Sequence, residues 1–470
     1  MAFEGTRGRK WAGALGYSIM IVGAIALFLL VRSAGSSLVA PAPALAGTTA
    51  VSAPAKADVL FHVLLALVVV IAAARVCGAL CKLIHQPPVI GEVIAGILLG
   101  PSLLGQISPA AMTYLLPSSV APFLSIIAQI GVILFMFLIG LELNTDQLRN
   151  RTHATVAISH ASILVPFVLG SLLALWLYPK LSTSDVPFTV FALFLGVSLS
   201  VTAFPVLARI LTDRGIHKTQ MGIVALTCAA VDDVTAWCLL AFLIAVAKAN
   251  VAGAFMTFAL TGLYLGFMLL AARPLIIRAV RSQELRGSVS QGAIAVVVIG
   301  LLLSTLATET AGIHAIFGAF LLGAIIPHDS RLARELTLKI EDLVVVLFLP
   351  AFFAFTGMRT QIGLVNGMSQ WILCGVILAA ASIGKFGGTF VAARITGFGS
   401  RDAASLGVLM NTRGLMELIV LNIGLDLHIL SPTLFAMLVL MAVITTLATT
   451  PFLQLLTRNA SEPEAEPVRV

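Results

Sequence analysis

Thirteen long runs of apolar residues, separated by short polar loops, follow one another from residue 58 of this chain onward. A helix that crosses a bilayer needs roughly 20 predominantly apolar residues. Each run can supply one such helix, so the sequence predicts an all-α, multi-pass membrane protein with thirteen core spans. The predicted spans are 58–76, 88–104, 122–142, 154–178, 187–213, 218–249, 253–273, 290–309, 311–328, 342–358, 369–397, 404–424 and 432–457.

The charge content excludes several other classes of protein. Charged residues make up only 10% of the 470 residues, whereas soluble domains carry about 25%. A soluble enzyme, a disordered chain and a nucleic-acid-binding domain are therefore excluded. The five cysteines have no His or Cys partner at metal-ligand spacing, so we expect no cofactor and no disulfide.

The distribution of basic residues predicts the orientation in the bilayer. Of the 28 Lys and Arg residues, 21 fall in loops on one side of the thirteen spans, five fall on the other side, and two lie within spans. Basic loops face the cytoplasm. The predicted location is thus a bacterial-type inner membrane, with the C-terminus and the short tail 458–470 in the cytoplasm. This asymmetry accounts for the net charge of +7 without a nucleic-acid partner.

Residues 1–57 stand apart from the thirteen spans. Basic residues precede an apolar run at 12–31, and a linker rich in Ala, Pro and Ser follows at 33–57. Residues 42–46 resemble a small-residue cleavage site, so the segment is either a signal peptide or an extra helix. The loops and the tail leave no stretch long enough for an attached soluble domain.

Short strings recur in order in the two halves of the chain. Residues 95–100 resemble 318–323, and residues 134–140 resemble 352–357. Spans one to six then map onto spans eight to thirteen, with the seventh as a joint that inverts the second half. Inverted repeats with a site near the midplane are a transporter architecture.

Ionisable residues inside spans are the first functional candidates, because each costs about 3 kcal/mol to insert at the centre of a membrane helix. The acids Asp232 and Asp233 lie in the middle of span 218–249 with long uncharged flanks. Adjacent helix positions point about 100° apart, so the two acids are expected to do different jobs. A buried carboxylate that binds either a proton or a metal cation is the minimum machinery for exchange. The alternative is a pair at a helix end in a wet loop.

The lysine Lys385 lies in the middle of a glycine-containing span, at residues 382–388. Glycines allow another helix to approach closely. A buried lysine needs a counter-ion, and Asp232 is the simplest choice. The alternative is an ammonium group that reaches the membrane surface along its own stem.

Two spans in corresponding positions of the halves are interrupted by polar residues. Residues 197–205 and 410–417 both break an apolar run, and paired interrupted spans are the best sequence indicator of a transport site. Arg413 is expected to offset the negative helix ends that face it, although a local ion pair with Glu417, four residues on, explains it equally well. The other candidate polar residues at the breaks are Ser200, Thr202, Asn411 and Thr412.

Glu92 is an accessory candidate. It follows a Pro-Pro pair at the entrance of span 88–104, and an interfacial position without a role in transport is the alternative.

Four strings together resemble the second monovalent cation:proton antiporter family, which includes Kef-type proteins and the plant cation/proton exchangers. They are residues 86–101, 135–143, 231–237 and 411–420. The resemblance covers residues 58–457 in the family's order.

This resemblance implies a homodimeric antiporter that exchanges Na⁺ or K⁺ for protons by an elevator-like movement of a core domain. By resemblance, Asp233 binds the cation and the proton, Asp232 pairs with Lys385, and the crossed discontinuous helices lie around Thr202 and Arg413. An Asp at 232 resembles the electrogenic members. The implied scaffold comprises 58–142 and 290–358, the implied core 154–249 and 369–457, and 253–273 links them. Many relatives carry cytoplasmic regulatory domains, for which we find no segment here.

Two rival functions stay open at this point. A sodium-coupled solute symporter of related fold would need a larger polar site, for which the sequence offers no extra polar residues. A membrane sensor with an inactive site would not need Asp232, Asp233 and Lys385 together. None of these readings is an enzyme.

Overall fold

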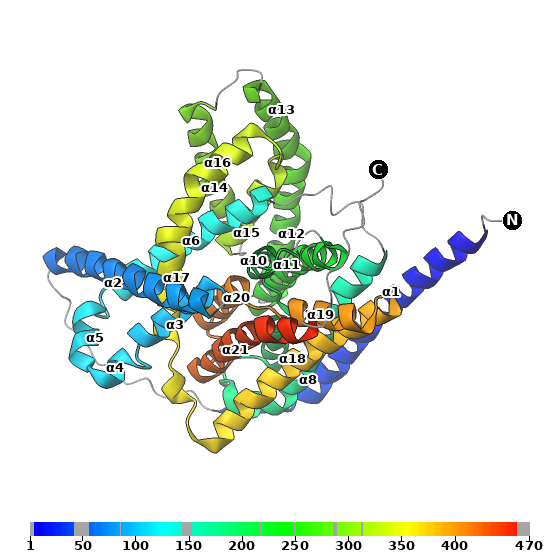
Figure 1. The fold of residues 1–470 in the computed structure, drawn as a ribbon, viewed down its shortest axis with the longest axis horizontal. Coiled ribbons are helices and arrows are strands. Elements are labelled where there is room, and N and C mark those ends of the chain that lie inside the picture. The colour runs from blue at the N-terminus through cyan, green and yellow to red at the C-terminus, as the bar shows by residue number, and fades with distance from the viewer. Residues whose placement is uncertain are drawn as a thin grey trace.

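The computed structural model describes residues 4–41, 56–84, 86–142, 153–216, 219–248, 251–284, 289–311 and 314–457. Every regular element in these ranges is a helix, as Figure 1 shows. The cleavage-like string 42–46, most of the linker, and the tail 458–470 lie outside the described residues.

A helix or a pair of helices occupies each of the thirteen predicted spans. The single helices are α2 (Lys56–Leu83), α3 (Pro88–Leu99), α6 (Ala121–Glu142), α8 (His153–Leu181), α11 (Gln220–Lys248), α14 (Gln291–Thr310), α15 (Ala315–Ile325), α18 (Gly367–Ile395) and α21 (Pro432–Thr457). Two continuous helices contain a π-helical turn: α12 (Val251–Phe267) with η1 (Met268–Ala272) and α13 (Arg273–Glu284), and α16 (Arg331–Leu343) with η2 (Val344–Phe348) and α17 (Leu349–Arg359).

The two spans with polar interruptions are broken helices, as predicted. One consists of α9 (Phe188–Ser200) and α10 (Phe204–Asp213), and the other of α19 (Ser400–Met410) and α20 (Leu415–Asp426). The second pair bends by 42° at its break.

The described helices differ in whether they are long enough to cross a membrane. Nine helices in the described part of the chain are long and apolar enough to cross a membrane, and α19 with α20 makes a tenth. Helices α9 and α15 are too short to cross a bilayer alone. The fold is therefore the expected all-helical membrane fold, and thirteen spans stay a prediction.

The helices pack into two groups. In the first, α3 packs on α2 and α17, and α15 packs on α6 and α14. In the second, α8 packs on α9, α11 and α18, and α21 packs on α18, α19 and α20. In Figure 1 the helices α2, α3 and α17 lie to the left, and α8, α18 and α19 lie to the lower right. We call these sets the first and the second helix group.

The repeated strings contact each other reciprocally in the first group. Gly96 of α3 lies against the backbone of α17 at Gly357, and Gly140 of α6 lies against the backbone of α15 at Gly323. A Cβ atom at any of these positions would overlap a backbone atom of the facing helix. Each string of the first half thus contacts one of the second half, and small residues permit this approach.

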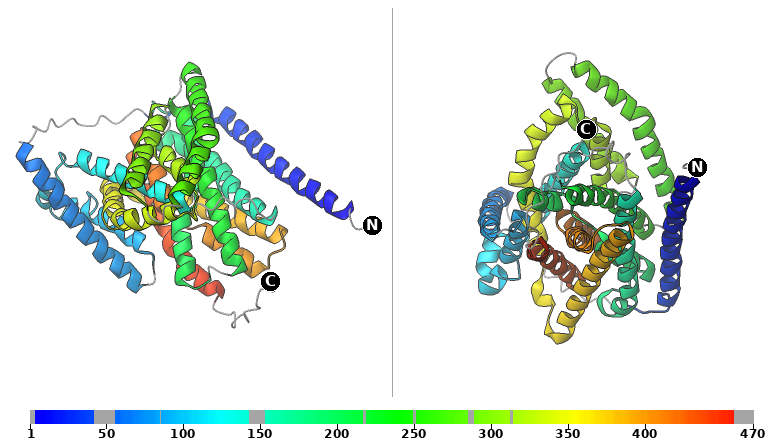
Figure 2. Two further views of the ribbon diagram at one scale, coloured as in Figure 1. Left: turned by 90° about the horizontal axis from the view of Figure 1, so that it is seen from above. Right: turned by 45° about the vertical axis from the view of Figure 1, so that its right-hand side comes forward.

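The segment before the linker forms a further helix, α1 (Glu4–Gly35). It packs on α8 and α9 of the second group. The rings of Phe28 and Phe167 pack at an angle of 44° with centroids 5.8 Å apart, and Gly35 lies directly against Phe188. Figure 2 shows α1 extending away from the rest of the molecule toward the N-terminus.

Candidate functional site

The two helix breaks contact each other inside the second group. The backbone N–H of Ala203 donates to the carbonyl of Thr412 at 3.0 Å, and the Thr202 hydroxyl lies 3.2 Å from the carbonyl of Met410. The second break therefore satisfies a backbone N–H that the first leaves open. Non-helical backbone at membrane depth is tolerated only where protein buries it in this way.

Two basic side chains cap the end of α9 at the break. The last carbonyls of a helix have no partner within it. Arg413 donates to the carbonyls of Ser198 and Leu199 at 2.8 and 2.6 Å, and Lys385 donates to that of Ser200. Positive charge at a helix C-terminus is stabilising, so both cations act on the negative end of α9. Arg413 thus contacts the negative end of α9, which is the kind of position expected for it from the sequence.

Arg413 also forms the local ion pair that the sequence left as an alternative. Its Nη1 lies 2.8 Å from Glu417 Oε2, and both side chains are fully buried. The Thr446 hydroxyl contacts the backbone N–H and the carbonyl of Arg413 at 3.0 and 2.8 Å. Arg413 thus connects the start of α20 to α9 and α21.

Asp232 accepts hydrogen bonds from three helices or breaks around it. Lys385 Nζ lies 3.1 Å from Oδ2, so this lysine is paired in the membrane interior. The Thr202 hydroxyl donates to Oδ2 at 2.9 Å. Two serines of α8 complete the set: Ser159 donates to Oδ1 at 2.7 Å, and Ser162 lies 2.6 Å from Oδ2.

Neither serine is among the site residues predicted from the sequence. The sequence does contain a pattern that could have identified them, because hydroxyl residues three positions apart in an apolar span share one helix face. Glycines in α18 bring α8 close to Lys385: Gly384 and Gly388 lie against Pro166 and Ala161.

Asp233 has surroundings opposite to those of its neighbour. Its side chain is buried, and neither carboxylate oxygen accepts a hydrogen bond of ordinary geometry from the described residues. The backbone N–H of Phe204, at the start of α10, is directed toward it, and Lys385 and Asp232 are the charges that act on it. The two adjacent acids therefore differ as their helical spacing predicts.

Other predicted site residues are placed differently. The Ser200 hydroxyl lies 2.7 Å from Gly196 O and 3.0 Å from Ile163 O, so Ser200 presents its carbonyl to Lys385 and keeps its hydroxyl within the helix packing. Asn411 leaves its side-chain oxygen without a hydrogen bond from the described residues. The Thr412 hydroxyl lies 3.5 Å from that of Thr449.

Glu92 lies outside this cluster. It is buried in α3 of the first group, and the basic residues that act on it electrostatically are Arg75 and Lys82 of α2. The structure therefore does not bring Glu92 together with the acid pair.

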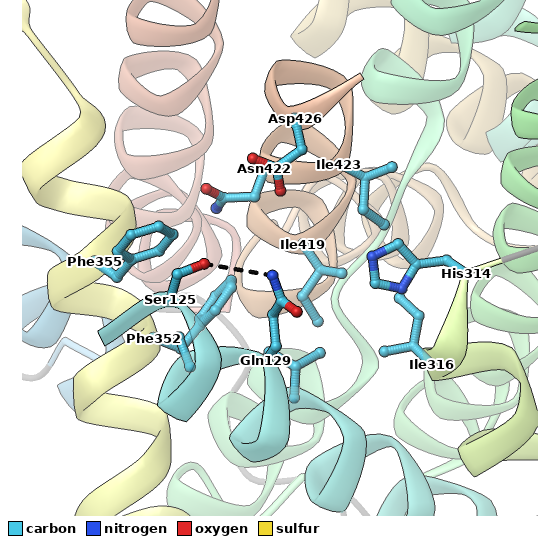
Figure 3. A pocket seen from close by; sticks show the side chains of 12 residues that line it. Ser125, Gln129, His314, Ile316, Phe352, Phe355, Ile419, Asn422, Ile423 and Asp426 are labelled. Atoms are coloured by element: carbon cyan, nitrogen blue, oxygen red, sulfur yellow. Dashed lines mark hydrogen bonds between the residues drawn. The ribbon is translucent and has the colours of Figure 1, made fainter. Parts of the chain in front are cut away.

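A small cavity with a largely apolar lining and a few polar side chains lies where the two helix groups meet. Its volume is ≈ 40 Å³, room for about two water molecules. Figure 3 shows Asn422 and Asp426 of α20 near Ser125 and Gln129 of α6. Arg359 of α17 bridges the groups here, with contacts of 2.7 Å to Asp426 and 3.2 Å to Asn422.

Residues 67–457 match the family described as sodium/hydrogen exchanger, transmembrane. The Na(+)/H(+) antiporter NhaS4 of Synechocystis is 46% identical over 396 residues, which are 84% of this chain and 97% of that protein.

Two eukaryotic relatives are longer than this chain. Cation/H(+) antiporter 20 of Arabidopsis thaliana is 40% identical over 81% of this chain and 47% of its own length. K(+)/H(+) antiporter 1 of Saccharomyces cerevisiae is 36% identical over 80% and 45%. The matched part of this chain spans about half of each of these two.

A solved structure shares the fold. The sodium proton antiporter MjNhaP1 of Methanocaldococcus jannaschii superimposes with a TM-score of 0.61 at 13% identity, over 85% of this chain and 99% of that chain. With the broken helices and the acid pair described above, the match over residues 67–457 establishes that this chain belongs to the transmembrane sodium/hydrogen exchanger family.

Proposed function

We propose that this chain exchanges a monovalent cation, Na⁺ or K⁺, for protons across a membrane, and that Asp233 binds the cation and the proton in turn. The observation that carries the proposal is the contrast between the two acids. Asp232 accepts hydrogen bonds at both oxygens, whereas neither oxygen of the buried Asp233 accepts one of ordinary geometry from the described residues, and only the N–H of Phe204 is known to be directed toward it. Asp233 is the carboxylate with open positions for a ligand.

The surroundings of Asp233 suit a small cation. The helix breaks place non-helical backbone beside the acid, and carbonyl oxygens of unwound helices coordinate Na⁺ in transporters. Competition follows, because one carboxylate cannot hold a proton and a cation together. The relatives' names give Na⁺, K⁺ or an unspecified cation, so the proposal covers both ions.

Movement of the second helix group against the first would give alternating access. Polar bridges between the groups include Arg359 with Asp426, and Gln86 with the carbonyl of Leu447 at 3.1 Å. These two bridges can break and be replaced by other polar contacts as the groups move. The ion pairs and hydrogen bonds of Asp232, Lys385 and Arg413, in contrast, join helices within the second group. We further propose that two copies join through the first group, in a bacterial-type inner membrane with the C-terminus in the cytoplasm.

The test uses purified protein in liposomes that contain a trapped pH dye. A pH gradient is imposed, and Na⁺, K⁺, Li⁺ or choline is added in turn. We expect the dye to respond to an alkali cation and not to choline. Asp233→Asn should abolish this response, and the matched control Asp402→Asn, an exposed acid in the first turn of α19, should retain it. Full exchange by Asp233→Asn would contradict the assignment of the site.

A further inference from the structure

Two buried serines of α8 hold the acid that does not carry the proposed ligand. Ser159 and Ser162 are both fully buried, and each contacts a different oxygen of Asp232, at 2.7 and 2.6 Å. Ser162 Oγ also lies 2.7 Å from the carbonyl of Ser159. The charged carboxylate is the stronger acceptor for its single proton.

These contacts decide where Asp232 and Lys385 lie. The serines approach Asp232 from α8, while Thr202 and Lys385 reach it from the break and from α18. The carboxylate is therefore held on several sides and cannot rotate toward Asp233 without losing donors. Lys385 is held in turn, between Asp232 and the carbonyl of Ser200.

Lys385 has a second anion within its electrostatic reach. The lysine acts on Asp233 as well as on Asp232. An ammonium group that moved to Asp233 would occupy the carboxylate proposed to bind the cation. The chain therefore carries an internal competitor for its own ligand, and something must keep that competitor on Asp232.

We propose that Ser159 and Ser162 are positioning residues for cation binding: they fix Asp232 where it retains Lys385 and so leave Asp233 open to the cation. This inference rests on the proposed function of Asp233. It assigns the two serines to ligand affinity and not to the rate of the conformational change.

The experiment measures initial exchange rates against cation concentration for the full chain in liposomes. Loss of one hydrogen bond to a charged group changes an equilibrium constant by about tenfold or more, and only part of that change reaches the cation site, because the serines act on it through Asp232 and Lys385. We expect KM for the cation to rise about threefold in Ser159→Ala or Ser162→Ala and about tenfold in the double variant, with kcat changed less than about twofold. Ser159→Thr, which keeps the hydroxyl, should restore most of the affinity.

The matched control is Ser171→Ala. Ser171 is a buried serine of the same helix whose hydroxyl bonds the carbonyl of Ala192 at 3.4 Å and does not contact Asp232. Its KM should equal that of the wild type. In a Lys385→Ala background, the serine substitutions should raise KM no further, because the internal competitor is absent.

The outcomes separate this inference from the proposed function. An unchanged KM in the serine variants, or an equal rise in Ser171→Ala, would overturn the positioning role while exchange by the wild type stands. A wild-type protein without cation-dependent exchange would overturn the proposed function itself. If the double variant does not fold, the two single variants decide the question on their own.

Discussion

Removing Arg413 should cost more stability than removing its partner Glu417, because the two residues have different numbers of contacts. The arginine side chain donates to Glu417 and to the carbonyls of Ser198 and Leu199. Without Glu417 it keeps two acceptors. Without Arg413, the carboxylate of Glu417 is left buried and loses its hydrogen bond to Oε2, while Oε1 has none from the described residues.

The magnitudes follow from these contacts. Leaving one member of a buried ion pair without its partner costs about 4 kcal/mol, so we expect this loss of unfolding free energy in Arg413→Ala. Losing a single charged hydrogen bond costs about 2 kcal/mol, which is the expectation for Glu417→Ala. The double variant leaves no isolated charge, so it should be no less stable than Arg413→Ala alone.

Denaturant unfolding in detergent micelles, followed by the fluorescence of the four tryptophans, measures these differences. Arg394→Ala is the control: this exposed arginine donates to the nearby carbonyl of Phe398, and its removal should change stability by about 0.5 kcal/mol or less. Equal losses in the two single variants, or additive losses in the double variant, would refute the reasoning.

Two other contacts give predictions that can be measured on the same preparations. Gly357→Ala should lower the unfolding free energy by about 2 kcal/mol through overpacking against α3. The control Gly375→Ala, with open space around the glycine, should not lower it. Equal Tm values for the two variants would contradict the close helix approach. Asp426→Asn removes a partly exposed ion pair between the helix groups, which is worth about 1 kcal/mol or less. The substitution should therefore leave Tm nearly unchanged. Because the ion pair restrains movement of the groups, its loss should raise the exchange rate by up to about fivefold. High ionic strength should raise the wild-type rate in the same way, and a slower variant would argue against the bridge as a restraint on movement.

Patterns within single segments were enough to predict the helices and their breaks. Polar residues interrupt two apolar runs, and the backbone is non-helical at 201–203 and 411–414. The spacing of Asp232 and Asp233 likewise predicts different surroundings, since adjacent helix positions diverge by about 100°. Hydropathy overestimates helix length where an apolar run continues past a helix end, as it does beyond Ile325 of α15.

Contacts between distant segments could not be read from the sequence in the same way. Ser159 and Ser162 reach Asp232 only because α8, α11 and α18 pack together, and a serine in any membrane helix has a local carbonyl as an alternative acceptor. Ser200 makes this point in reverse: it is next to the break, yet its hydroxyl stays within the packing of α8 and α9. The sequence predicted an anion for Lys385, but not the helix end that it also caps.

The capping of α9 has a consequence for how the chain is made. The carbonyls at the end of α9 emerge from the ribosome long before Lys385 and Arg413, which satisfy them. Until α18 and α20 arrive, the first half carries exposed carbonyls and an unpaired Asp232 within the membrane, where such groups are costly. The second half therefore completes the first during biosynthesis, and a chain truncated before residue 385 should be a substrate for quality control and not a stable half-protein.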